Sequence, residues 1–142
     1  MSPVVCATRG GEACRVTQEK AIDIAQERGA ELIFLYAVDL TLAGPVDEAM
    51  EEPLKGEMAR LGRALLRMAQ ARASKRGMTA GSKLLYGPVG ASIRNYLKDH
   101  PASTLVLGAP RSSSGARVFT TDGIQSFAQE ISQGSDVEVV VT

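Results

Sequence analysis

The sequence predicts an α/β domain built on a doubly wound, five-stranded parallel sheet of strand order 3-2-1-4-5, with helices on both faces. Short apolar runs alternate with longer amphipathic stretches from one end of the chain to the other. Such alternation is typical of parallel strands joined by right-handed crossover helices. The strongest run, residues 32–38, is apolar throughout, which indicates a strand covered on both faces.

Each element is expected from a local signal in the chain. The strands are expected at residues 4–8, 32–38, 83–86, 104–107 and 137–141. The helices are expected at residues 12–28, from 54 to about 77, from Pro88, and after Asp122 as an N-cap. Gly29 suits a left-handed cap that ends the first helix. The stretch 39–53 contains Gly44, Pro45 and Pro53, and is expected to be a loop.

The long helix predicted after this loop is amphipathic. Its apolar residues recur at three- and four-residue steps: Leu54, Met58, Leu61, Leu65, Met68 and Ala69. Acidic residues lie before or within its start, and basic residues lie late in it, which complements the helix dipole. We interpret the charges as a solvated face, because a nucleic-acid surface needs a basic excess that the whole chain lacks.

Composition limits the function classes. The 142 residues suit one domain, spanning 1–142, and 44% apolar with 23% charged residues is typical of globular proteins. Sixteen basic residues balance sixteen acidic ones, which argues against nucleic acid or an anionic membrane as a partner. No apolar run approaches the roughly 20 residues of a membrane span, and the start does not resemble a secretory signal. A cytoplasmic location is therefore expected.

Cysteine, histidine and sequence motifs argue against several chemistries. With only Cys6, Cys14 and His100, Cys/His metal sites of the usual kind are not expected. The sequence allows a disulfide between Cys6 and Cys14, although two reduced thiols are favoured. The chain contains no Walker loop, no G-x-G-x-x-G and no G-x-S-x-G. His100 is expected to cap a helix. A phospho-receiver domain needs acidic residues at the end of the first strand, and this chain has Thr8 and Arg9 there, which argues against that class.

Two polar, glycine-containing segments are the candidates for ligand binding. One follows the first strand and consists of Thr8, Arg9, Gly10 and Gly11. The other follows the fourth strand and contains Gly108, Arg111, Ser112, Ser113, Ser114 and Gly115. The predicted topology brings both to the crevice where ligands bind in doubly wound sheets. Glycine, serine and arginine there favour an anion such as phosphate. The alternatives are a tight turn and a flexible surface loop.

The order and spacing of five segments resemble the universal stress protein family. Residues 10–14 resemble its Gly-Ser-Glu-Ala-Ser turn, and residues 21–38 are similar to its first helix and second strand. Further similarity lies at 87–93, 102–108 and 137–141. The resemblance implies an adenine-nucleotide alpha-hydrolase-like fold and a site for ATP or AMP. It also implies a homodimer through the last strand, at Val137, Val139 and Val141.

The chain departs from the family's ATP-binding pattern. Arg9 stands where that pattern has an aspartate, and Arg111 stands at the second glycine of a Gly-x2-Gly-x9-Gly-Ser/Thr loop. Gly108 matches the first glycine, and the pair Asp122-Gly123 best matches the third element, in a loop that is one residue longer. Asp122 beside Gly123 would repel a triphosphate.

The resemblance therefore predicts a regulatory or binding domain with a degenerate adenine-nucleotide site, rather than an efficient enzyme. In that site the base is expected near Thr8, Ala37 and Val38. The phosphates are expected near Gly108, Arg111, Ser112 to Gly115, and Gly123. The alternative is a ligand-free interaction module, such as the soluble regulatory domain of a transporter. Slow ATP hydrolysis ranks third.

Overall fold

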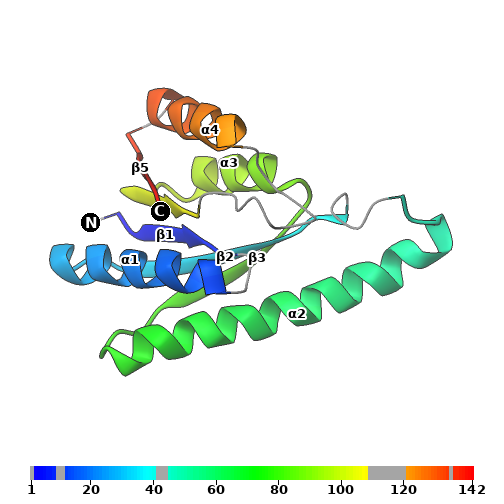
Figure 1. Cartoon of the computed structure of the whole chain (residues 1–142), viewed down its shortest axis with the longest axis horizontal. Coiled ribbons are helices and arrows are strands. Elements are labelled where there is room, and N and C mark those ends of the chain that lie inside the picture. Colours follow the sequence, from blue (N-terminus) through cyan, green and yellow to red (C-terminus); the bar gives the residue numbers. More distant parts are fainter. Residues whose placement is uncertain (1, 9–11, 41–44, 109–120, 135) are drawn as a thin grey trace.

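The computed structural model of the chain describes residues 2–8, 12–40, 45–108, 121–134 and 136–142. Within these ranges strands and helices alternate strictly (Figure 1). The strands are β1 (Val4–Ala7), β2 (Leu32–Val38), β3 (Gly81–Tyr86), β4 (Thr104–Leu107) and β5 (Glu138–Val141). The helices are α1 (Glu12–Arg28), α2 (Glu48–Lys75), α3 (Val89–Asp99) and α4 (Thr121–Gly134).

The five strands form one sheet in the order β3-β2-β1-β4-β5, and every neighbouring pair is parallel. The predicted fold class is thereby confirmed. Helices α1 and α2 lie on one face, and α3 and α4 lie on the other (Figure 1). The chain reverses its winding after β3, because the strand that follows returns to pair with β1 on its other side.

Two hydrophobic cores fill the spaces between the sheet and its helices. Successive residues of a strand point to opposite faces, so Val4 and Cys6 enter the core under α1 and α2, while Val5 enters the other core. In β4, Val106 joins the first core and Leu105 joins the second. These five residues are completely buried. Both faces of the central strands are covered, which is why their sequences do not alternate.

The face of α2 that packs on the sheet differs from the apolar face that its periodicity indicates. The buried residues are Ala59, Gly62, Leu66, Ala69 and Ala73. Of the predicted residues only Ala69 is among them, whereas Leu61 is 54% and Met68 56% exposed. A Cβ added to Gly62 would lie 2.5 Å from Cδ1 of Tyr36 and 2.8 Å from Cδ2 of Leu84. Small residues therefore let this helix approach β2 and β3 closely.

Several predicted boundaries are wrong. Helix α2 begins at Glu48 and contains Pro53, so residues 48–53 are helix rather than loop. Glu48 and Glu51 lie in its first turn, where negative charge is favoured. Asp122 lies inside α4, which begins at Thr121, and so is not its N-cap. Val137 precedes β5 and is 6% exposed.

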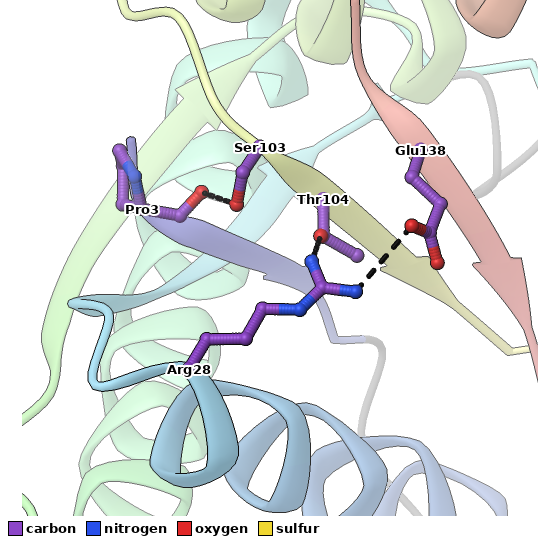
Figure 2. A network of polar contacts seen from close by, with 5 residues as sticks. All are labelled: Pro3, Arg28, Ser103, Thr104 and Glu138. Atoms are coloured by element: carbon purple, nitrogen blue, oxygen red, sulfur yellow. Dashed lines mark hydrogen bonds and ion pairs between the residues drawn. The ribbon is translucent and has the colours of Figure 1, made fainter. Parts of the chain in front are cut away.

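Polar contacts at the amino end of the sheet join α1 to β4 and β5, and the start of β1 to the start of β4 (Figure 2). The guanidinium of Arg28, in the last turn of α1, donates to Oγ1 of Thr104 at 2.6 Å and approaches Oε2 of Glu138 at 3.4 Å. The carbonyl of Pro3 accepts from both the backbone N–H and the hydroxyl of Ser103, at 2.9 and 3.3 Å. These contacts hold β1, β4 and β5 in register at the amino ends of the strands, opposite the candidate site.

Candidate functional site

The candidate site lies at the carboxyl ends of β1 and β4, which are neighbours in the sheet. The register pairs Cys6 with Val106. Continued by two residues, it places Thr8 opposite Gly108. Helix α1 follows β1 on one face of the sheet and α4 follows β4 on the other (Figure 1). In open α/β sheets, ligands bind where successive connections diverge in this way.

Thr8 is held by a chain of two hydrogen bonds, the first buried and the second partly buried. It is 3% exposed, and its Oγ1 accepts from Nε2 of Gln18 at 2.7 Å. Oε1 of Gln18 in turn accepts from a guanidinium nitrogen of Arg72 at 2.6 Å. The chain links β1, α1 and α2, and fixes the backbone where it leaves the sheet. Sequence reasoning missed Gln18, although it precedes the buried Ile22 by one helical turn and so shares its face.

The end of β2 adds a carboxylate that sequence reasoning assigned only to a loop. Ala37 is half-buried, and the carbonyl of Val38 accepts from the N–H of Gly87 at 3.0 Å. Asp39 follows and is 4% exposed. Its Oδ2 accepts from the backbone N–H of Val89 at 3.3 Å. The acid thus lies at the start of α3, where the helix dipole favours negative charge.

The carboxyl end of β4 is fastened to the last residue of the chain. The carbonyl of Leu107 accepts from the N–H of Thr142 at 2.8 Å. The hydroxyl groups of Thr142 and Thr17 are hydrogen-bonded at 2.7 Å. Gly108 comes next and is partly exposed. The last strand and α1 therefore fix the point at which the chain enters the candidate loop.

The structure gathers only some of the predicted residues. Thr8, Ala37, Val38 and Gly108 lie at the carboxyl ends of three adjacent strands. Gly123 lies in the first turn of α4 rather than in a loop. The remaining predicted residues fall outside the described ranges: Arg9, Arg111, Ser112, Ser113, Ser114 and Gly115.

His100 lies at the carboxyl end of α3 and serves as its cap. Its backbone N–H donates to the carbonyl of Tyr96 at 2.8 Å, and its ring stacks on that of Tyr96 with 4.5 Å between centroids. Burial raises the pKa of Tyr96. Because α3 runs back from the carboxyl ends of the strands, His100 lies at their amino ends, away from the candidate site. The predicted capping role is confirmed.

Comparison with known proteins agrees with this architecture. The model of the universal stress protein family matches residues 1–142. The chain belongs to the universal stress protein family. A search of curated protein sequences found no match.

Solved structures of universal stress proteins share the fold along almost the whole chain. UspA from Lactobacillus plantarum is 21% identical, with a TM-score of 0.73, over 99% of this chain and 97% of that one. A universal stress protein in complex with cAMP is 23% identical, with a TM-score of 0.68, over 99% and 96%. One from Archaeoglobus fulgidus in complex with dAMP is 16% identical, with a TM-score of 0.62, over 99% and 97%.

In this universal stress protein domain, the described site offers backbone and hydroxyl groups more than ionisable ones. Among the described residues, no group of three or more His, Cys, Asp or Glu side chains is placed to hold a metal ion. No helix in the described ranges is long and apolar enough to cross a membrane. What the described part of the site supplies is a buried hydroxyl at Thr8, a carboxylate at Asp39 and the partly exposed Gly108.

Proposed function

We propose that this domain binds an adenine nucleotide in a regulatory role, between the segments that follow β1 and β4. The observation that carries the proposal is the parallel pairing of β1 with β4 at the point where the winding reverses. The complexes of two family members with cAMP and dAMP support the choice of ligand.

In the proposed complex the base lies near Thr8, Ala37 and Val38, and the phosphate lies on the other side of the crevice. Gly108 has no side chain, so its backbone can approach a phosphate closely. Ser112 to Gly115 and Arg111 supply hydroxyl groups, backbone N–H groups and one positive charge. The first turn of α4, with Gly123, adds the positive end of a helix dipole.

The charges favour a monophosphate over a triphosphate. Asp122 precedes Gly123 in the first turn of α4 and carries the same sign of charge as the phosphates. A triphosphate brings more negative charge to this turn than AMP does. We therefore expect AMP to bind more tightly than ATP.

Arg9 provides the test of this proposal. It replaces an aspartate of the family pattern with a longer side chain of opposite charge. Isothermal titration calorimetry with AMP should show tighter binding by Arg9→Asp than by the parent, by about tenfold or ~1.4 kcal/mol. Arg63→Asp, on exposed α2 surface, makes the same change of net charge and should bind as the parent does.

One outcome contradicts the role given to Arg9, and another contradicts nucleotide binding itself. Equal or weaker binding by Arg9→Asp removes the argument about this residue. Failure of both the parent and Arg9→Asp to bind AMP or ATP at millimolar concentration leaves the ligand-free interaction module as the function.

A homodimer through the edge of β5 belongs to the same proposal. The strand lies at the end of the sheet, pairs with β4 on one side only, and is built from Val139, Val140 and Val141 after Glu138. An edge strand presents N–H and C=O groups that a second copy can pair with. The cytoplasmic location expected from the sequence stays a prediction.

A further inference from the structure

Helix α2 carries a second apolar stripe that its own domain covers only in part. We call the following residues the α2 stripe: Leu54, Met58, Leu61, Leu65 and Met68. None of them is buried, and Leu61 and Met68 are 54% and 56% exposed. At about 100° per residue, their centre lies roughly a quarter of a turn from the side that packs on the sheet. The α2 stripe is therefore additional to the core.

The first part of α2 receives little support from its own domain. None of residues 48–58 is buried. In Figure 1 this end of α2 extends beyond the strands. Helices draw most of their stability from tertiary packing, and short unsupported ones are marginal in water. Leu54 and Met58 lie on this projecting part, so a partner on the α2 stripe would stabilise it.

The spacing of the α2 stripe is that of a coiled-coil seam. Its residues follow one another at steps of four and three, as at heptad positions a and d. The same steps continue toward the helix start to Glu51 and Asp47, and toward its end to Arg72 and Lys75. One seam thus has an acidic end, an apolar middle and a basic end.

The rest of α2 shows the same segregation of charge. Residues 48–57 contain four acids and one lysine: Glu48, Glu51, Glu52, Glu57 and Lys55. Residues 58–75 contain five basic residues and no acid: Arg60, Arg63, Arg67, Arg72 and Lys75. A copy of this helix in the opposite direction is complementary to it in charge, and a copy in the same direction is not.

We propose that the α2 stripe binds the α2 stripe of a second copy, antiparallel, about a two-fold axis at Leu61. Leu54 then faces the partner's Met68, and Met58 faces the partner's Leu65. Such an isologous contact is self-complementary and closes. The interface consists of a central apolar seam between two acidic–basic ends.

The charged ends fit this arrangement. Asp47 and Lys75, both exposed, face the partner's Lys75 and Asp47. Glu51 faces the partner's Arg72. One guanidinium N–H of Arg72 is bonded to Gln18, and a guanidinium has five donors in total.

The α2 contact is independent of the proposed β5 contact. Helix α2 packs on β2 and β3, at one end of the sheet, whereas β5 is at the other end. Each surface can therefore be disrupted without touching the other.

Sedimentation velocity at micromolar concentration tests the α2 contact. Leu61→Lys places two positive charges together at the two-fold axis and should lower the number of chains per particle. Ser74→Lys adds the same charge on an exposed position facing away from the α2 stripe, and should leave the assembly unchanged. Circular dichroism should show both variants folded, because Leu61 is largely exposed. A monomeric parent, or Leu61→Lys assembled as the parent is, overturns the proposal.

A charge reversal tests the direction of the two helices. Lys75→Glu sets an acid against the partner's Asp47, and should raise the dissociation constant several-fold. Adding Asp47→Lys to the same chain restores opposite charges and should recover most of the lost affinity. If the double variant is as weak as Lys75→Glu alone, the antiparallel arrangement is wrong.

Discussion

Gly62 shows how a single residue sets the distance between a helix and the sheet. Alanine in a helix interior is favoured over glycine by about 1 kcal/mol. At this position, however, its Cβ would lie within 3 Å of both the Tyr36 ring and Leu84. Overpacking typically costs about 1–3 kcal/mol. Because the gain in helix propensity offsets part of this cost, we expect Gly62→Ala to lower the free energy of unfolding by up to about 2 kcal/mol, as measured by urea denaturation.

Gly56, six residues earlier in α2, is the matched control. A Cβ there meets nothing within 4 Å. Gly56→Ala therefore gains helix propensity without a clash, and should raise the free energy of unfolding by about 1 kcal/mol. If both substitutions stabilise the protein, Tyr36 can move aside and the close approach at Gly62 is not a constraint.

At the residue scale the candidate site was only partly predictable. Thr8 and Gly108 could be placed because each directly follows a buried strand, and topology alone brings such positions together. Gln18 could not be singled out, because its partner Thr8 is ten residues away and its other partner is Arg72. Contacts between side chains on different elements leave no periodic signal in the sequence.

At the element scale, periodicity located helices and strands better than it located their ends and faces. The predicted apolar face of α2 is its exposed stripe, and the true core face is rich in alanine and glycine. Small residues carry little hydrophobic signal, yet they are what a helix needs to approach a sheet closely. Pro53 likewise predicts a break, but the acidic first turn and the long amphipathic run extend the helix through it.

The contact between α1 and β4 supports a prediction at this scale. Thr104 is completely buried, and its hydroxyl accepts from Arg28 at 2.6 Å. Arg28→Met keeps the aliphatic stem but removes the donor, and should lower the free energy of unfolding by about 1–3 kcal/mol. Adding Thr104→Val removes the buried hydroxyl as well, and should recover most of the loss.

Glu138 is the control for this pair. Its contact with Arg28, at 3.4 Å, joins two substantially exposed side chains. Exposed ion pairs contribute little, so Glu138→Gln should change the free energy of unfolding by less than about 1 kcal/mol. A double variant no more stable than Arg28→Met would show that the buried hydroxyl is not the source of the cost. Thermal and urea denaturation of the variants measure all of these differences.

At the scale of the whole molecule, the strand order was predictable, and it decides where two copies can meet. Alternating strands and helices with a resemblance to one family lead to the order 3-2-1-4-5, which leaves β3 and β5 as edges. The projection of α2 beyond the strands was not predicted, because the sequence indicates a loop over residues 48–53 and a helix that begins at Leu54. Both proposed contacts between copies, at β5 and at the α2 stripe, follow from this arrangement.

The β5 edge supports the last prediction. The N–H groups of Glu138 and Thr142 donate to β4, at 3.0 and 2.8 Å. Because alternate residues of a strand turn the same way, Val139 and Val141 direct their N–H groups to the free edge. Both side chains also pack partly against the second core, so charged substitutions there would disturb packing as well as association.

Val139→Pro removes an edge donor without removing a hydrogen bond to β4, and proline is tolerated on edge strands. It should therefore lower the number of chains per particle in sedimentation velocity while leaving circular dichroism unchanged. Val139→Thr keeps both the N–H and the shape of the side chain, and should assemble as the parent does. If the proline variant assembles as the parent does, the β5 edge is not an interface between copies. Combined with Leu61→Lys, Val139→Pro should give monomers, because each substitution removes a different one of the two contacts.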